Sequence, residues 1–221
     1  MRTSLVSLLL VVSGCGSVVP PECQMMPSAQ NGYVLRFTRT GAASPGCDTA
    51  TPQETSDIWI FDTLADSEVR VHAALSMAYP PDAPDPLPAG LIGAGKFAQR
   101  EADADSNCTI QSFTTMTQGT LSYSMTNLVA LGSAATQNAE FKADVTLTQG
   151  ACSADYTVQA LSPAVPCDSD ADCDPFKQPL SSGIFSVFDQ GCHMDAWTAP
   201  VAAALGKAGV CFLNKEFPSL K

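Results

Sequence analysis

Residues 141–159 read FKADVTLTQGACSADYTVQ, and apolar and polar side chains alternate along both halves of this stretch. A period of two places alternate residues on the same face of a β-strand. The two halves therefore predict an antiparallel hairpin with a four-residue loop at 148–151. This pairing sets Leu147 opposite Cys152 and Phe141 opposite Val158, and it keeps every apolar side chain on one face.

The same period recurs through most of residues 30–165. It predicts further strands at 33–39, 57–62, 69–75, 91–99, 108–116 and 121–131. Gly, Pro, Asn or Asp occurs between most of these segments, which is typical of an antiparallel β-sandwich or barrel. Residues 79–90 contain five prolines and predict a surface loop within one mainly β domain.

Composition and charge narrow the class of protein. The chain has 221 residues, of which 45% are hydrophobic and 15% charged, so it is long enough and apolar enough to bury a core. Asp and Glu number 22 against 11 Lys and Arg, giving a formal net charge of −11. Because nucleic-acid phosphates repel a polyanion, the composition predicts that nucleic acid is not a partner.

The amino terminus predicts export. Arg2 precedes the apolar run 5–12, and the small residues Ser13 and Gly14 follow it, so residues 1–14 are expected to be a signal peptide. The run is too short for a membrane-spanning helix, which needs about 20 apolar residues. The segment 12–15, Val-Ser-Gly-Cys, resembles a bacterial lipobox.

That resemblance implies that Cys15 receives diacylglycerol and becomes the acylated first residue of the mature chain. Palmitate-type acyl chains would anchor the protein in a membrane, and residues 15–29 would form the lipidated amino terminus and a tether. Gly16, where an Asp would resemble an inner-membrane retention signal, favours the outer membrane. The alternative is ordinary secretion with cleavage at Gly14 or Gly16.

The cysteine count agrees with lipidation. The chain has nine cysteines, and setting Cys15 aside leaves eight, an even number that predicts four disulfides in an oxidising compartment. Sequence alone leaves their pairing open, and two histidines with no Cys-x-x-Cys pair disfavour zinc. The cysteines expected to pair are Cys23, Cys47, Cys108, Cys152, Cys167, Cys173, Cys192 and Cys211.

The pattern changes near Pro166. Four cysteines fall within residues 166–221, which predicts a small disulfide-stapled C-terminal module containing one short helix. Thr198 is expected to cap that helix, Pro200 fits its first turn, and Gly206 lies near its end. Residues 210–213 are expected to form a strand.

An acidic run at the start of this module is a candidate metal site. Asp168, Asp170 and Asp172 alternate beside Cys167 and Cys173. Alternate carboxylates can converge on Ca²⁺, although the run lacks the Gly and the Glu of an EF-hand. The alternative is a solvated acidic turn, and no other cofactor is expected.

The sequence contains no recognised catalytic motif. A nucleophile elbow, a metalloprotease helix and nucleotide-binding glycine loops are all missing. His72 is expected at the surface, His193 beside a disulfide as a structural polar residue, and Trp59 in the core. We therefore expect that the protein is not an enzyme.

The full layout resembles predicted cysteine-rich lipoproteins of myxobacteria. The similarity covers about the last hundred residues, including the phrase ADYTVQALSPAVPC at 154–167, and implies no activity. The sequence thus predicts a lipid-anchored cell-envelope protein with a structural or interaction role, whose partner is an unknown envelope protein or glycan. The alternatives are a calcium-assisted binding module for envelope carbohydrate or protein and a hydrolase without a recognised motif.

Overall fold

The computed structural model describes residues 21–25, 32–73, 91–133, 135, 136, 138–176 and 182–218. Its strands within the first part of the chain are β1 (Tyr33–Arg39), β2 (Glu54–Thr63), β3 (Glu68–His72), β4 (Ile92–Phe97), β5 (Asn107–Phe113), β6 (Met116–Gln118), β7 (Leu121–Leu131), β8 (Glu140–Gln149) and β9 (Cys152–Leu161). The C-terminal part contains β10 (Pro166–Cys167), β11 (Gln190–His193), β12 (Gly209–Leu213) and the helix α1 (Ala199–Leu205). Short 3₁₀ helices are η2 (Ala65–Ser67), η4 (Asp170–Cys173) and η5 (Ala196–Thr198).

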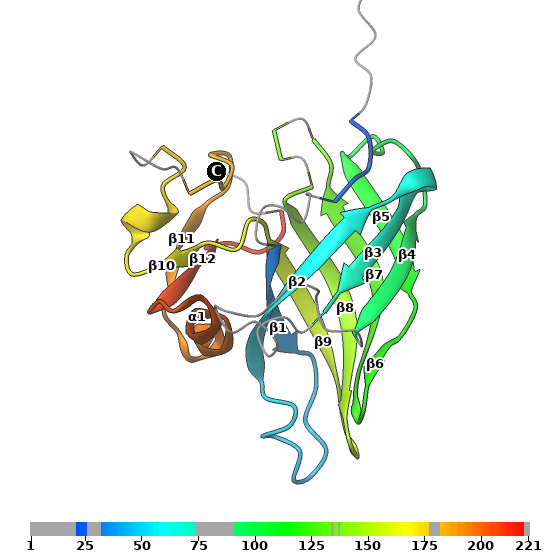
Figure 1. Ribbon diagram of the computed structural model, residues 1–221, viewed down its shortest axis with the longest axis vertical. Helices are drawn as coiled ribbons and strands as arrows, with labels where there is room; N and C mark the ends of the chain where they lie inside the picture. Colours follow the sequence, from blue (N-terminus) through cyan, green and yellow to red (C-terminus); the bar gives the residue numbers. More distant parts are fainter. Residues whose placement is uncertain are drawn as a thin grey trace, which may run out of the picture.

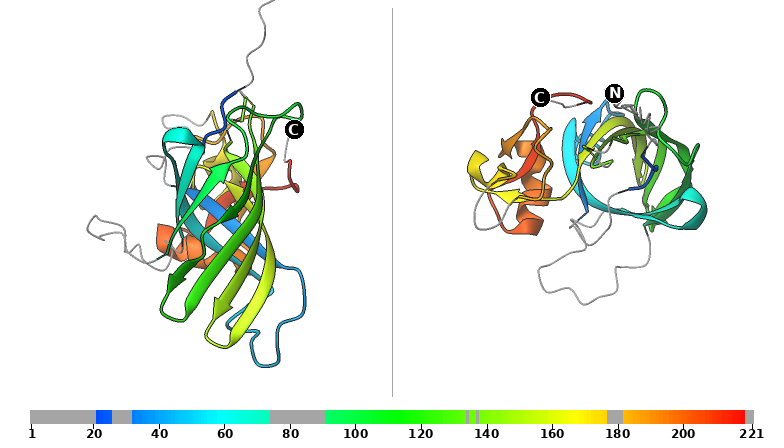
Figure 2. Two further views of the ribbon diagram at one scale, coloured as in Figure 1. Left: turned by 90° about the vertical axis from the view of Figure 1, so that its right-hand side faces the viewer. Right: turned by 90° about the horizontal axis from the view of Figure 1, so that it is seen from above.

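The nine strands β1–β9 form one antiparallel sheet in the order β5-β4-β3-β2-β1-β9-β8-β7-β6. β5 also pairs with β7, from Asn107 opposite Leu131 to Ser112 opposite Thr126. This pairing closes the sheet into a barrel of β1–β5 and β7–β9, hereafter the ring, which is seen end-on in Figure 2. The mainly β, antiparallel class expected from the sequence is confirmed. Because the sheet closes on itself, the ring is a barrel rather than a sandwich of two separate sheets.

The β8–β9 hairpin is confirmed, but its predicted register is wrong by two residues. Gln149 pairs with Cys152, and Leu147 pairs with Ala154 rather than with Cys152. The loop therefore contains two residues, and Gly150 takes a positive φ of 61° there. Two-residue hairpin loops match the twist of the flanking strands, and a shift of two leaves each side chain on its predicted face.

Most other predicted strands are present. β1 and β7 have the predicted bounds, whereas the predicted strand 108–116 is split into β5 and the start of β6. The split adjoins an irregularity in the pairing of β4 with β5, where the register shifts between Gly95 and Phe97. Residues 74 and 75 of the predicted strand 69–75, and the proline-rich loop 79–90, lie outside the described residues.

The ring interior is filled by aromatic side chains. Tyr33, Phe61 and Phe141 contact one another at ring-centroid distances of 5.2–5.3 Å. Trp59 is fully buried, as expected, and stands edge-on to Tyr123 at 5.2 Å. This packing makes most of the interior a solid core, since aromatic pairs favour such tilted contacts.

The C-terminal part packs against the outside of the ring, where α1 and η5 contact β2 (Figure 1). Its three-stranded sheet has the order β10-β12-β11, so the predicted strand at 210–213 is present as part of β12. Ser56 of β2 donates a 2.7 Å hydrogen bond to the carbonyl oxygen of Trp197, and the Arg36 guanidinium lies 5.0 Å from the Trp197 ring centroid. These contacts fix η5 and α1 to the ring.

The predicted short helix is present, with Pro in its first turn and Gly206 in the left-handed conformation at its C-cap. Thr198 occupies the N-cap position but does not cap through its side chain. Its hydroxyl donates to the carbonyl oxygen of Asp195 at 2.8 Å, because Thr198 already has helical dihedrals as the last residue of η5. None of the described helices has the length and apolar character required to span a membrane.

Residues 21–25 belong to the folded part. Cys23 is bonded to Cys108 of β5, and its backbone N–H donates to the carbonyl oxygen of Arg100 at 2.8 Å. Met25 is 2% exposed, and its backbone N–H donates to Thr63 Oγ1 at 2.7 Å. The segment lies at the upper end of the ring in Figure 1, so the part of the predicted tether from Pro21 to Met25 is fixed to that end.

Candidate functional site

All eight cysteines predicted to pair are in disulfides. The ring is stapled by Cys23–Cys108 and Cys47–Cys152, and the C-terminal part by Cys167–Cys192 and Cys173–Cys211. Their Cα–Cα distances of 5.5–5.8 Å lie within the normal range for disulfides. Cys15 is therefore the one cysteine of the sequence that has no place in these four pairs.

The three aspartates of the acidic run each accept a hydrogen bond within the protein. Asp168 accepts from Lys207 Nζ at 2.6 Å, which lowers the pKa of the Asp168 carboxyl. Asp170 Oδ1 accepts from the Cys192 backbone N–H at 2.8 Å, and Asp172 Oδ2 accepts from the Asp168 N–H at 2.8 Å. The contacts match the acidic-turn alternative, and calcium binding by these residues stays a prediction.

Among the described residues, one group of potential metal ligands is clustered: Cys167, Cys173 and Cys211. Their sulfur atoms lie within 4.8 Å of one another because two disulfides pack side by side. Disulfide sulfur is not a thiolate, so this group is explained by structural bonds rather than by a metal.

The two histidines lie in different parts of the molecule. His72 is half-buried on β3, and burial, as the largest influence, lowers its pKa from the ordinary 6.5. His193 is at the end of β11, with Nδ1 3.6 Å from Asp195 Oδ2 and its ring 5.8 Å from that of Trp197. They stand in separate sheets, which Figure 1 shows apart, so the structure does not bring the two imidazoles into one site.

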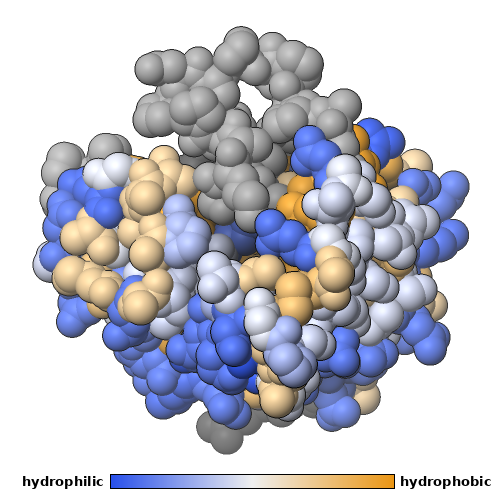
Figure 3. Space-filling model, turned by 90° about the horizontal axis from the view of Figure 1, so that it is seen from below, coloured by the Kyte–Doolittle hydropathy of each residue, from blue (hydrophilic) through white to orange (hydrophobic). Residues whose placement is uncertain are grey.

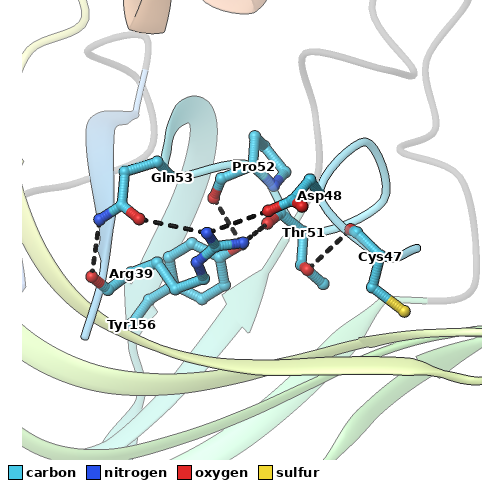
Figure 4. A network of polar contacts seen from close by, with 7 residues as sticks. All are labelled: Arg39, Cys47, Asp48, Thr51, Pro52, Gln53 and Tyr156. Carbon is cyan, nitrogen blue, oxygen red and sulfur yellow. Dashed lines mark hydrogen bonds and ion pairs between the residues drawn. The ribbon is translucent and has the colours of Figure 1, made fainter. Parts of the chain in front are cut away.

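The end of the ring opposite residues 21–25 carries a loop, residues 40–53, that a polar network holds in place (Figure 4). Arg39 ends β1, and its side chain is only 8% exposed. Its guanidinium donates to the carbonyl oxygen of Thr51, to Asp48 Oδ1 at 3.2 Å and to Gln53 Oε1 at 3.2 Å. One guanidinium thus ties three residues of the loop to the strand.

Two further contacts fix the same loop. The Tyr156 hydroxyl of β9 donates to the carbonyl oxygen of Pro52 at 2.9 Å, and burial raises the pKa of Tyr156 against the opposing effect of Arg39. The Cys47–Cys152 disulfide joins the loop to the first residue of β9. The loop is therefore held at several points along its length.

Beneath this loop, the lower end of the ring contains an open cavity of about 200 Å³. Thr49, Ala50 and Pro52 of the loop form part of its rim, and Pro200 of α1 forms another part. The space-filling view of this end shows apolar side chains within a largely hydrophilic surface (Figure 3). Its walls include Phe37, Leu121, Tyr123 and Leu147 from three strands, together with the carboxyl-bearing Asp57 from a fourth.

This cavity is the candidate site, and the sequence analysis did not identify it. Asp57 alternates with Trp59 and Phe61 and so faces the ring interior, where it is 4% exposed. An ionisable residue in the apolar register of a strand is a signal that could have drawn attention to this position. The other wall residues come from strands that are distant in sequence, and their meeting depends on the closure of the ring.

Comparison with known proteins identifies the family. The model of the MlpA family matches residues 32–163, which span all of β1–β9 and more than half of the chain. No curated protein and no solved structure matches the chain. The protein belongs to the MlpA family.

Proposed function

We propose that the protein is an exported lipoprotein, anchored in the outer membrane by acyl chains on Cys15, and that its folded part is a non-catalytic interaction module of the cell envelope. The observation that carries this proposal is the pairing of all eight other cysteines into four disulfides. Disulfides of this density are typical of an oxidising compartment outside the cytosol. The remaining thiol stands in the Val-Ser-Gly-Cys segment that resembles a lipobox.

The attachment point of the amino terminus supports an interaction role for the opposite end of the ring. Pro21 follows Cys15 by six residues, and an extended chain spans at most about 3.6 Å per residue, so an anchor on Cys15 would lie at most about 20 Å of chain from the fold. Residues 21–25 are fixed to the upper end of the ring (Figure 1). An anchored molecule would thus present loop 40–53 and the cavity away from the bilayer, toward an envelope protein or glycan.

Metabolic labelling tests the anchor. Cells expressing the wild-type chain are fed an alkyne analogue of palmitate, and the protein is then captured, analysed for label and located by cell fractionation. We expect label and membrane association in the wild type and loss of both in Cys15→Ala. Ser13→Ala is the matched control, because it keeps a small residue before the cysteine and should remain labelled. Unchanged labelling of Cys15→Ala would refute the proposal.

A further inference from the structure

Two disulfides of the C-terminal part lie side by side. Cys167–Cys192 joins β10 to β11, and Cys173–Cys211 joins η4 to β12. The sulfur atoms of Cys167, Cys173 and Cys211 all lie within 4.8 Å of one another. Disulfides this close can exchange partners once one bond is opened, because exchange requires only that a thiolate reaches a disulfide sulfur. The four cysteines are hereafter the sulfur cluster.

The cysteines of the sulfur cluster differ in exposure. Cys167 and Cys211 are fully buried and Cys173 is 2% exposed, whereas Cys192 is half-buried on the edge strand β11. The rate of exchange depends on which sulfur an incoming thiolate can reach, so an external thiol would attack Cys192. That attack releases Cys167 as a thiolate, which remains inside the fold beside Cys173 and Cys211.

The C-terminal sheet already aligns a second pair of cysteines. Cys192 and Cys211 are directly opposite in the β11–β12 pairing, so their side chains lie on the same face. The Cys192 N–H donates to Asp170 Oδ1 and the Cys211 N–H donates to the carbonyl oxygen of Val165, both at 2.8 Å, so neither N–H is directed at the opposite cysteine. In such a non-hydrogen-bonded pair the Cα atoms are about 4.5 Å apart, which a disulfide can span.

We propose that the sulfur cluster is a site of thiol–disulfide exchange, at which an external thiol attacks Cys192 and the cluster passes to a second pairing, Cys167–Cys173 with Cys192–Cys211. The thiol first bonds to Cys192 Sγ while the Cys167–Cys192 bond breaks. The Cys167 thiolate then bonds to Cys173 Sγ, and Cys211 leaves as a thiolate. Cys211 finally bonds to Cys192 Sγ and displaces the external thiol.

The exchange is balanced without an oxidant or a reductant. Every step forms one S–S bond and breaks one, so the cluster contains two disulfides at the start and two at the end. The external thiol loses a proton when it attacks as a thiolate and regains it after it is displaced. The co-reactant is therefore a thiol that is regenerated.

The second pairing would change which segments are joined. In the observed pairing, disulfides bond residues 167–173 to both β11 and β12. In the second pairing, Cys167–Cys173 closes that segment on itself, and Cys192–Cys211 joins β11 to β12. No disulfide would then join the acidic run to β11 or β12. This inference goes beyond the proposed interaction role, and it is independent of acylation because Cys15 has no part in the cluster.

Cysteamine is a suitable probe, because its ammonium group matches the acidic surroundings of Cys192. Asp170 Oδ1 lies 2.8 Å from the Cys192 backbone nitrogen, and Asp168 of the same run is exposed. The full chain with its native disulfides is incubated with cysteamine at about pH 8, where part of the thiol is ionised. Samples are then acidified, alkylated in denaturant and cleaved before aspartates without reduction.

This cleavage places the four cysteines of the sulfur cluster on separate peptides, because an aspartate lies between each consecutive pair in the sequence. None of these peptides contains Cys15, so mass spectrometry of linked peptides reads the pairing of the cluster directly. We expect a cysteamine adduct on Cys192 at early times, followed by Cys167–Cys173 and Cys192–Cys211 linkages.

The ring provides an internal control. Cys152 is half-buried like Cys192, but neither Cys47 nor Cys152 belongs to the sulfur cluster. The other disulfide of the ring, Cys23–Cys108, lies at its opposite end (Figure 1). A thiolate released on Cys47 has no second disulfide beside it, so the original bond re-forms. We therefore expect no new pairing of Cys47 or Cys152 under the conditions that rearrange the cluster.

Two matched variants test the internal step without an external thiol. Cys192→Ser leaves Cys167 as a thiol beside Cys173–Cys211, so we expect the alkylated thiol to be found on Cys211 as well as on Cys167. Cys152→Ser likewise removes the half-buried partner of a disulfide, but it leaves Cys47 outside the cluster. Its alkylated thiol should be found on Cys47 alone.

Three results would overturn the proposal. They are the absence of the second pairing in the wild type, first adducts on the buried cysteines of the cluster instead of Cys192, and a thiol in Cys192→Ser that stays on Cys167 alone. Mapping of the wild type decides the question even if Cys192→Ser does not fold. Failure of these tests in a protein that is still labelled at Cys15 would remove the exchange site and leave the lipid anchor in place.

Discussion

Arg39 and Asp57 are charged residues at inward positions of strands whose other inward residues are mainly apolar. Phe37 precedes Arg39 on the same face of β1, and Trp59 follows Asp57 on the same face of β2. The Arg39 guanidinium donates to loop 40–53, and the Asp57 carboxylate accepts from the Ile58 and Trp59 N–H groups. The two residues therefore shape one end of the ring, since a buried charge needs such partners.

Arg39 is predicted to stabilise the fold through the geometry of its guanidinium as well as its charge. Arg39→Lys keeps the charge but cannot reach Thr51, Asp48 and Gln53 together, so we expect a loss of about 2 kcal/mol in the free energy of unfolding. Urea denaturation of the protein with its disulfides formed measures this loss of free energy. Arg100→Lys is the control, because the Arg100 side chain is 79% exposed and pairs with an exposed Glu22. Equal stability of Arg39→Lys and wild type would contradict the role given to the network.

His72 is predicted to make stability depend on pH. Burial lowers its pKa below 6.5 in the folded protein, so the unfolded chain binds the proton more tightly. The contribution of His72 is fully present above about pH 6.5 and is lost as the pH falls through that value toward the folded pKa. Melting temperatures at several pH values should fall less steeply in His72→Gln than in the wild type. Superimposable profiles would show that His72 does not contribute.

At the scale of elements, the β8–β9 hairpin shows what alternation can and cannot predict. The period of two identified both strands and the buried face, but registers that differ by two residues bury the same side chains. The observed two-residue loop depends on Gly150, whose φ of 61° is accessible to glycine at low cost. The turn residue, rather than the strand pattern, therefore distinguishes the registers.

Gly150→Ala is predicted to destabilise the protein by about 1 kcal/mol, because an alanine strains the left-handed backbone. A Cβ at Gly150 would meet no atom within 4 Å, so the cost comes from the backbone alone. Gly41→Ala is the matched control, since its Cβ also meets nothing and its φ is not in the left-handed region. Urea denaturation of the two variants should separate them, and equal effects would contradict this account of the turn.

At the scale of the whole molecule, the sequence predicted strands well and their long-range partners poorly. Local alternation and turn residues specify β1, β7 and the hairpin strands, whereas the β5–β7 and β1–β9 pairings join segments that are not consecutive. Such pairings depend on tertiary packing that a single sequence does not encode in any short window. The sequence therefore left the sandwich and the barrel as alternatives, and the closure of the ring appears only in the structure.

The same reasoning explains why the disulfide network was predicted in number but not in connectivity. The even number of cysteines besides Cys15 predicted four disulfides. In the folded chain, these disulfides join cysteines separated by 25 to 105 positions. The cavity was missed for a related reason, because Phe37, Asp57, Tyr123 and Leu147 come from four different strands. Its one local signal, a carboxylate in the inward register of β2, identifies a position but not its neighbours.

Intact-mass analysis of the protein purified from membranes tests the central claim that Cys15 carries lipid while the other eight cysteines are paired. The sample is alkylated first without and then with reductant. We expect a mass that includes acyl chains on Cys15, no alkylation before reduction and eight alkylated thiols after it. An unacylated Cys15, or any alkylation before reduction at one of the eight paired cysteines, would contradict the account.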